Sequence, residues 1–526
     1  MILYYALTTY HILCCMLHRM TQRKDESATL LLSNIHFNSV AGLKKYESSD
    51  IFNEIKIIDE LECLVQTRRK EKRGEHVQKI IRKEAKTFYK KLPVHLPDYD
   101  EVILCSDHFP MGWAMLTKRI SYDYIEEACG SLSQQELIRS NMKRNKTQYE
   151  SLAFMQYFGQ SPLVKTIYAD IERQEPNYKN KKMKDFSVKK ILKNMSPEEQ
   201  TKILHFFGMQ VYQWTDRKVA LILTQNMENL GLRSLQEQHL LYQLLADYFC
   251  QGMQLVVKPH PDDIAGMYQE CFRGEATVLP FNAPSELLPY CWPGTFDLGI
   301  TVSSTAILGL ADRLQRQVSF DIRIHTDFKQ IHRYAAAMVL IQAWGLPAWD
   351  YGLNDRLWDE LGMVMLQPEL VKGRAENLRD VPGVLVVDQV EDSMVDFLQS
   401  RDEGEPVIFL NTQEDYRYFD GKNYKVFENI RPLVLQKMQD GVSKEKEEYI
   451  WIYAKGGNKK VAENISWERH LKYTGLTLYI EGIGCKEEWK IKVLEGVLKA
   501  TEARLLEYEK ENAILREKLK ARQVEK

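Results

Sequence analysis

The sequence has no excess charge of either sign, no paired-cysteine motif and no long apolar run, and each absence excludes a class of protein. Among its 526 residues, 71 Lys and Arg oppose 73 Asp and Glu, so no overall field marks a nucleic-acid binder. The nine cysteines are odd in number and form no CxxC pair, which indicates free thiols in a reducing compartment. No stretch approaches the roughly 18 uninterrupted apolar residues of a spanning helix. We therefore expect a cytoplasmic protein that captures anions locally.

Metal-binding and targeting motifs are missing as well. The histidines and cysteines form no HExxH or paired-cysteine spacing, so we expect no metal site and no bound cofactor. The N-terminal segment is apolar, but no basic stretch precedes it and Thr8-Thr9-Tyr10-His11 interrupts the run. We expect a buried strand, a loop and a helix there instead of a signal peptide.

The composition is that of a globular chain, with 44% hydrophobic and 27% charged residues. In the first third, short apolar runs alternate with segments of helical period, which indicates a parallel α/β sheet covered on both faces. The expected strands are Ile2–Leu7, Thr29–Leu32, Ile55–Ile58, Val102–Cys105 and Ile120–Ile125. Ligands of such sheets lie beyond the carboxyl ends of the strands, so functional residues are expected there.

A lysine-rich, mostly helical connection over residues 133–215 leads to a second α/β domain, so a cleft between two such domains is expected. Helices are predicted over Gln236–Phe249 and Thr305–Leu314. The expected strands are Val219–Thr224, Leu255–Val257, Thr277–Leu279, Leu298–Val302 and Val318–Phe320. Residues 330–400 look helical around one strand, Gly383–Val387, and either close the second domain or pack back on the first.

The character of the sequence changes near Pro406. Aromatic-rich runs without βα alternation indicate an accessory α+β module. Its expected strands are Val407–Leu410, Tyr449–Tyr453 and Leu476–Glu481. The predicted domains are 1–210 on the acceptor side, 211–400 for a nucleotide donor, 401–485 as the accessory module, and 486–526 as a terminal helix.

The terminal helix carries a heptad repeat. One set of positions is Leu498, Leu505, Asn512 and Leu519, and the complementary set is Leu494, Thr501, Tyr508 and Leu515. A parallel homodimer through a coiled coil is one interpretation. A solvated helix that packs one face on its own domain is the other.

The strongest local signal is Lys258-Pro259-His260-Pro261, which follows an apolar strand. The two prolines restrict the backbone on each side of His260, so the imidazole is held at the carboxyl end of a strand. A fixed imidazole beside a lysine suits a phosphate that gains charge as it leaves. A rigid turn with a structural histidine is the alternative.

A second signal is Ser303-Ser304-Thr305, which follows the strand Leu298–Val302 and precedes a predicted helix. Hydroxyl side chains at a helix start cap free N–H groups, and the same geometry binds anions. Both signals fall at strand ends of one sheet, so a phosphate between them is expected. Glu286 lies in the first turn of a predicted helix. Its negative charge either interacts favourably with the helix dipole or accepts hydrogen bonds from ribose hydroxyls.

The third signal lies in the first domain, where Glu126 and Glu127 follow a predicted strand. A surface acid pair is common and needs no function. At the carboxyl edge of a sheet facing a cleft, however, one carboxylate could act as a general base with its pKa raised by burial and its neighbour. A base in one domain and a leaving-group site in the other is what group transfer requires.

A carboxylate pair near a glycine, a later Lys-Pro-His-Pro run and a still later Ser/Thr run resemble the three motifs of the bacterial sialyltransferases with GT-B folds. The resemblance is nearest to the lipooligosaccharide sialyltransferases and capsular polysialyltransferases. It covers roughly residues 1–330, and the first βα unit with Thr8-Thr9-Tyr10-His11 is also similar. One departure is Ala128, which stands where those families place glycine, with Gly130 two positions later.

The resemblance implies a GT-B-like pair of doubly wound domains and inverting transfer from CMP-sialic acid to a cell-surface glycan or glycolipid, as in capsule or lipooligosaccharide biosynthesis. Glu126 or Glu127 would remove the acceptor proton. His260 and Lys258 would stabilise the departing phosphate, with Pro261 shaping the turn. The run Ser303 to Thr305 would grip the phosphate, and Glu286 would hold the ribose. A single phosphate leaving group needs no metal for this.

Two other functions fit the sequence. Glycerophosphate polymerases of the teichoic-acid type share a comparable histidine-proline and serine-rich arrangement, so another nucleotide-linked donor is the first. A non-catalytic scaffold with a degenerate nucleotide site is the second, favoured by the altered acidic motif. Basic stretches at 68–91 and 179–193 are either solvated faces or a track for a polyanionic acceptor or the inner membrane face, which would make the protein peripheral there.

Overall fold

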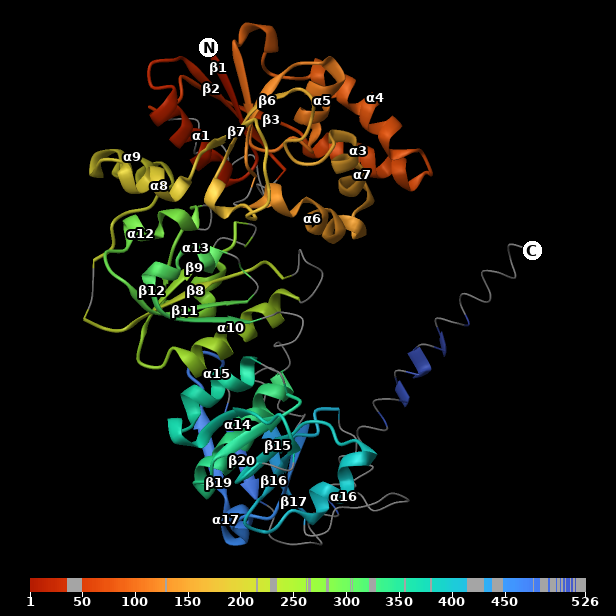
Figure 1. Cartoon of the computed structure of the whole chain (residues 1–526), viewed down its shortest axis with the longest axis vertical. Coiled ribbons are helices and arrows are strands. Elements are labelled where there is room, and N and C mark those ends of the chain that lie inside the picture. Colours follow the sequence, from red (N-terminus) through yellow and green to blue (C-terminus); the bar gives the residue numbers. More distant parts are fainter. Residues whose placement is uncertain are drawn as a thin grey trace. The chain divides into compact units, whose positions relative to one another are not determined.

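The computed structural model describes residues 1–35, 50–127, 130–213, 216–227, 234–261, 263, 266–280, 283–302, 304, 306–320, 328–353, 356–378, 381–413, 430–437, 448–475 and 477–482, and separate helical positions between 491 and 516. These residues belong to two compact units. The first contains 1–226, 254–270 and 275–317, and the second contains 227–253, 271–274 and 318–526. Figure 1 shows the chain with its elements labelled.

The first unit contains a sheet of seven parallel strands in the order β3-β2-β1-β4-β5-β6-β7. The strands are β1 (Ile2–Ala6), β2 (Ala28–Ser33), β3 (Glu54–Ile58), β4 (Glu101–Leu104), β5 (Tyr122–Ile125), β6 (Val164–Ala169) and β7 (Met183–Asp185). All five strands expected from the first third are confirmed. The expectation of a mostly helical segment at 133–215 was wrong in part, because β6 and β7 lie within it.

Helices cover both faces of this sheet. Ile2 and Tyr4 of β1 belong to one core with α1 (Thr9–Gln22), whereas Leu3 and Tyr5 belong to a second core with residues of α4 (Val77–Lys90) and α5 (Pro110–Lys118). A strand buried on both faces must be apolar throughout, which is why Ile2–Ala6 shows no alternation. Thr8 caps α1 by accepting a hydrogen bond from the His11 amide at 3.2 Å, so the predicted strand, loop and helix are confirmed.

A second sheet has the order β10-β9-β8-β11-β12, and β10, β9, β8 and β11 run parallel. Its strands are β8 (Val219–Leu223), β9 (Gln254–Lys258), β10 (Thr277–Val278), β11 (Phe296–Val302) and β12 (Leu314–Phe320). All five were expected, so the expectation of two α/β sheets built from parallel strands is confirmed for the first part of the chain. The helix expected over Thr305–Leu314 is wrong in length, since α13 spans only Ala306–Gly309 and β12 begins at Leu314.

Helix α10 (Leu235–Phe249) was expected and is confirmed, but it belongs to the second unit. Its Asp247 side chain accepts hydrogen bonds from the amides of Tyr473 at 2.7 Å and Thr474 at 3.0 Å. A buried carboxylate bonded in this way ties the helix to a segment more than two hundred residues later. The compact units therefore do not follow the boundary predicted at residue 210.

The second unit contains an eight-stranded mixed sheet in the order β14-β13-β15-β16-β18-β17-β20-β19. Its strands are β13 (Ala348–Tyr351), β14 (Val371–Arg374), β15 (Val384–Val387), β16 (Val407–Phe409), β17 (Ile430–Lys437), β18 (Glu448–Lys455), β19 (Ser466–His470) and β20 (Thr477–Gly482). Strands β13, β14, β15 and β16 pair in parallel, whereas the pairings that involve β17, β18, β19 and β20 are antiparallel. Strands β15 and β16 lie on opposite sides of the boundary predicted at residue 400 and pair within this one sheet.

The remaining α-helices are α3 (Leu61–Lys72), α6 (Gln135–Asn141), α7 (Lys146–Met155), α8 (Val188–Asn194), α9 (Pro197–Phe206), α11 (Met267–Cys271), α12 (Leu288–Cys291), α14 (Phe328–Trp344), α15 (Arg356–Met365), α16 (Asp392–Ser400) and α17 (Lys459–Asn464). No helix of the described residues is long and apolar enough to cross a membrane. All seven described cysteines are buried free thiols, as expected. Leu498 and Leu505 are helical and exposed, whereas Leu494, Thr501, Leu515 and Leu519 lie outside the described residues.

Candidate functional site

The strand order of the first sheet reverses between β1 and β4. In open parallel sheets, ligands bind beyond the carboxyl ends of the strands at such a switch point. The chain following β1 enters α1 through Thr8, and the chain following β4 carries Ser106, Asp107 and His108. The three residues that follow β4 are all buried. The switch point is therefore lined by polar side chains that the protein has withdrawn from solvent.

Glu127, which follows the neighbouring strand β5, joins this group. Its Oε2 atom accepts a hydrogen bond from Ser106 Oγ at 3.3 Å and lies 3.5 Å from His108 Nδ1. The Ser106 hydroxyl and His108 Nδ1 are 3.0 Å apart. His11 of α1 is fixed against the same residue, because its Nδ1 accepts from the Leu7 amide at 3.4 Å and its Nε2 lies 3.1 Å from the Glu127 carbonyl oxygen.

The surroundings of Glu127 favour its protonated form. Burial, followed by the nearby charge of Asp107, raises the pKa of Glu127 to about 8, and the hydrogen bond from Ser106 opposes the shift. Burial also raises the pKa of Asp107 to about 7. The Glu127 side chain is 25% exposed, so a substrate hydroxyl can reach it. A carboxyl group with these properties can take up a proton near neutral pH.

Glu126 has a different environment, although it was predicted as an equal candidate. Its Oε1 atom accepts hydrogen bonds from Gln174 Nε2 at 2.8 Å, the Leu132 amide at 3.3 Å and Ser131 Oγ at 3.4 Å. Burial raises the pKa of Glu126, and these hydrogen bonds oppose the shift. Three donors on one oxygen of a side chain that is only 4% exposed give Glu126 the contacts of a structural residue.

The Lys258-Pro259-His260-Pro261 turn follows β9 at the carboxyl edge of the second sheet, where it was expected. The His260 amide donates to Thr224 Oγ1 at 2.8 Å and to Asp263 Oδ2 at 2.9 Å. Asp263 Oδ2 also accepts from Thr224 Oγ1 at 2.7 Å. Since Thr224 follows β8, these contacts hold the backbone of His260 against the neighbouring strand, while the residue remains half-buried.

Lys258 is buried, with 5% of its surface exposed, and donates from Nζ to the Pro259 carbonyl oxygen at 2.5 Å. Burial lowers the pKa of Lys258 to about 8, while the charges of Glu286 and Asp263 oppose the shift. Burial likewise raises the pKa of Glu286, and Lys258 opposes that shift. Glu286 lies in the short 3₁₀ turn Ser285–Leu287, and its place with Lys258 in one donor site remains a prediction.

Of the predicted run Ser303-Ser304-Thr305, the structure describes Ser304 alone. Ser304 follows β11 and its amide donates to Thr301 Oγ1 at 3.3 Å, while Ser303 and Thr305 lie outside the described residues. Sheet order also reverses between β8 and β11, so Thr224 and Ser304 follow the two strands that flank the second switch point. Helix α13 behind Ser304 spans four residues, and its dipole is correspondingly weaker than the longer predicted helix implied.

Helix α1 connects the groups of the two sheets. Burial, followed by the charge of Cys105, raises the pKa of the Cys14 thiol, and the charges of Glu286 and Glu126 raise it further. A single hydrophobic core contains Cys14 and Ile125 together with Leu287 and Ile307. Leu287 adjoins Glu286, and Ile125 adjoins Glu126. The residues next to Glu126 and to Glu286 therefore pack in the same hydrophobic core.

Sequence reasoning missed Ser106, Asp107, His108, Thr224 and Asp263. Each lies in a loop at the carboxyl edge of its sheet. Ser106 to His108 directly follow a predicted strand, Thr224 was the last residue of another, and Asp263 comes two residues after Pro261, so their position at strand ends was an available signal. The basic stretch at 68–91 lies largely on α3 and α4, where Lys70 pairs with Glu84 at 2.5 Å. Among the described residues, no group of three or more potential ligand side chains is arranged to hold a metal ion.

Comparisons with known proteins give weak structural likenesses. No family model matches the chain, and no curated protein matches it. The UDP-GlcNAc 2-epimerase of Methanocaldococcus jannaschii has 11% identity and a TM-score of 0.33, with 70% of this chain and 94% of that chain covered. The Neisseria meningitidis UDP-GlcNAc 2-epimerase bound to UDP-GlcNAc has 13% identity and a TM-score of 0.32, with 58% and 78% covered.

A spinosyn rhamnosyltransferase is similar at 10% identity and a TM-score of 0.28, with 64% of this chain and 85% of that chain covered. Likenesses at this level carry no argument about function. Any assignment of function therefore depends on the residues of the two switch points.

Proposed function

We propose that the protein is an inverting glycosyltransferase that moves sialic acid from CMP-sialic acid to a hydroxyl group of a cell-surface glycan or glycolipid. The acceptor oxygen attacks the anomeric carbon and forms the new C–O bond. The bond between that carbon and the CMP phosphate oxygen breaks, and the phosphate leaves with the electron pair. The acceptor proton goes to Glu127.

Glu127 is the preferred base because its contacts leave it available. Ser106 and His108 orient its Oε2 atom, whereas Glu126 is held by three donors. A pKa near 8 makes the carboxylate a stronger proton acceptor than an exposed glutamate, although it lowers the ionised fraction at pH 7. The nearby His108 can stabilise the ionised form when the substrate excludes water.

The leaving phosphate is assigned to the second switch point. Lys258 supplies positive charge there, and His260, whose backbone is held by Thr224 and Asp263, supplies a hydrogen bond or a proton. Ser304, with Ser303 and Thr305, is assigned to the phosphate oxygens, and Glu286 to the ribose hydroxyls. A phosphate anion near Lys258 would also restore the charged state that burial now disfavours.

The observation that supports this division most strongly is the hydrophobic core that the two sheets share at α1. Ile125, which adjoins Glu126, and Leu287, which adjoins Glu286, belong to this one core together with Cys14 of α1. Group transfer requires a base and a leaving-group site near one reaction centre.

Release of CMP and formation of product from CMP-sialic acid test the proposal, with other nucleotide sugars and CDP-glycerol as competing donors. We expect turnover with CMP-sialic acid and a loss of about 100-fold or more in kcat/KM for His260→Ala. His95→Ala is the matched control, since His95 is exposed. Turnover only with another donor would replace the donor assignment, and the absence of any nucleotide binding would favour a scaffold.

A further inference from the structure

The sheet of the second unit has a switch point of its own. Strand β14 pairs with one edge of β13 and β15 with the other, so the chain reverses direction across the sheet between β13 and β15. Both strands are parallel, and their carboxyl ends therefore meet at one edge. This is the geometry at which open α/β sheets bind ligands, and neither proposed catalytic group belongs to this sheet.

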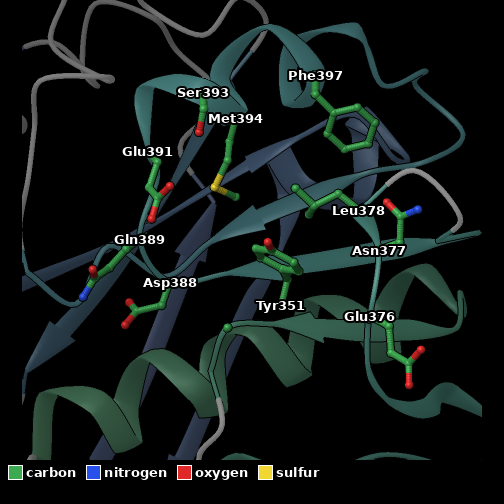
Figure 2. Close-up of a pocket in the computed structure, with 11 residues that line it drawn as sticks. Tyr351, Glu376, Asn377, Leu378, Asp388, Gln389, Glu391, Ser393, Met394 and Phe397 are labelled. Atoms are coloured by element: carbon green, nitrogen blue, oxygen red, sulfur yellow. The ribbon is translucent and has the colours of Figure 1, made fainter.

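A groove of about 550 Å³ lies at this edge, within the usual range for small-molecule sites. Tyr351 ends β13, Asp388 directly follows β15, and Phe397 belongs to α16. Figure 2 shows the Tyr351 ring in the middle of the groove, with Leu378 and Met394 above it and Asp388 to one side. The groove thus combines aromatic and apolar surface with polar groups along its rim.

The charges of the groove select against phosphorylated ligands. Its lining includes the carboxylates of Glu376, Asp388 and Glu391, and none of the eleven lining residues is Lys or Arg. A nucleotide would bring negative charge to negative charge with no cation to offset it. The second groove therefore has the opposite chemistry to the Lys258 site.

Asp388 is held in a fixed orientation. Its Oδ1 atom accepts from the Thr412 amide at 3.0 Å and from Thr412 Oγ1 at 2.6 Å, and its Oδ2 lies 2.7 Å from the same hydroxyl. A carboxylate has about four lone-pair directions, so capacity for further donors remains. Gln389 and Asn377 add amide groups to the lining, and Tyr351 and Phe397 are half-buried with part of their surface exposed.

We propose that this groove binds a neutral, hydroxyl-rich saccharide. Sugar hydroxyls would donate to Asp388 and Glu391, and the apolar C–H face of the sugar would pack on Tyr351, since aromatic rings offer broad surface at little cost in side-chain entropy. The inference goes beyond the proposed transfer reaction and stands or falls separately from it.

Saturation-transfer NMR and calorimetric titration of the full chain test it, with lactose and chitobiose as neutral probes and CMP and spermidine as charged ones. We expect saccharide binding that weakens about tenfold or more in Tyr351→Ala and in Asp388→Asn. Tyr508→Ala and Asp98→Asn are matched controls at exposed positions and should bind as the wild type does. Unchanged thermal unfolding would establish that each variant is folded.

Should Tyr351→Ala unfold the protein, Phe397→Leu provides a second test of the aromatic surface. Saccharide affinity that is unchanged in both Asp388→Asn and the aromatic variant would overturn the proposal, as would no saccharide binding at all. CMP or spermidine competing at Tyr351 in place of saccharides would overturn it too. His260→Ala should leave saccharide binding intact even if donor turnover is lost, which separates this proposal from the transferase assignment.

Discussion

Ser106 Oγ donates a hydrogen bond to Glu127 Oε2 over 3.3 Å, although twenty residues, including α5 and β5, separate the two positions. The contact exists because β4 and β5 are neighbouring parallel strands whose carboxyl ends lie side by side. It distinguishes Glu127 from Glu126, whose side chain bonds to Gln174, Ser131 and Leu132 instead. The backbone of His260 is held by corresponding contacts, to Thr224 after β8 and to Asp263.

Glu127→Gln should abolish most transfer while leaving the fold intact, because the amide keeps the shape of the side chain but cannot accept the acceptor proton. We expect kcat/KM to fall by about 100-fold or more, measured as CMP release from CMP-sialic acid. Glu126→Gln is the internal comparison and should act chiefly through thermal stability, since it disturbs a buried hydrogen-bond group. The reverse pattern, with Glu126→Gln inactive and stable, would transfer the role of base to Glu126.

The pH profile of kcat/KM should have a maximum near pH 8. Glu127 must be ionised to accept a proton, and its pKa of about 8 produces a limb that rises with pH. Lys258 must be charged to stabilise the phosphate, and its lowered pKa of about 8 produces a limb that falls above that value. Lys258→Arg keeps its charge at high pH, so it should flatten the alkaline limb. An alkaline limb unchanged in Lys258→Arg would assign that limb to another group.

Asp263→Ala should lower both stability and activity. The substitution removes the acceptor that Thr224 Oγ1, Tyr268 Oη and the His260 amide share, and a buried donor that loses its partner costs about 1–3 kcal/mol. The His260 amide keeps only its bond to Thr224 Oγ1 from this pair of contacts. Thermal unfolding should shift downward, and kcat/KM should fall about tenfold as His260 loses its fixed position. Asp312→Ala, at a 59% exposed surface pair with Lys189, is the control. Wild-type activity in a folded Asp263→Ala protein would show that the turn needs no such clamp.

Gly112→Ala should destabilise the first unit and disturb the loop that carries Ser106 to His108. A Cβ atom at position 112 would stand 1.8 Å from the backbone oxygen of Asp107, so α5 or the loop would have to move. Overpacking of this kind costs about 1–3 kcal/mol or more. Gly404→Ala has no neighbour within 4 Å and should unfold like the wild type. Equal unfolding temperatures for the two variants would contradict the close packing of α5 on this loop.

The sequence by itself determined five strands of the first sheet, all five of the second and their parallel arrangement, whereas β6 and β7 of the first sheet were missed. Runs such as Ile2–Ala6 and Val219–Leu223 are apolar on both faces, and only burial between two helical layers accounts for such composition. It also placed His260 at a strand end, because proline restricts the backbone through local sterics that need no distant partner. The free thiols follow from the same local evidence.

Tertiary structure alone decided which of the acidic residues are free to act and where the third sheet begins. Ser106 and Glu127 meet only because β4 and β5 are neighbours, and Thr224 holds His260 only because β8 lies beside β9. Strands β13 and β14 are short and half-buried, so their residues lack the apolar signal that revealed the others. Hydrogen bonds between segments distant in sequence produce no periodic pattern in the sequence. These contacts could therefore be identified only once the pairing of the strands was known.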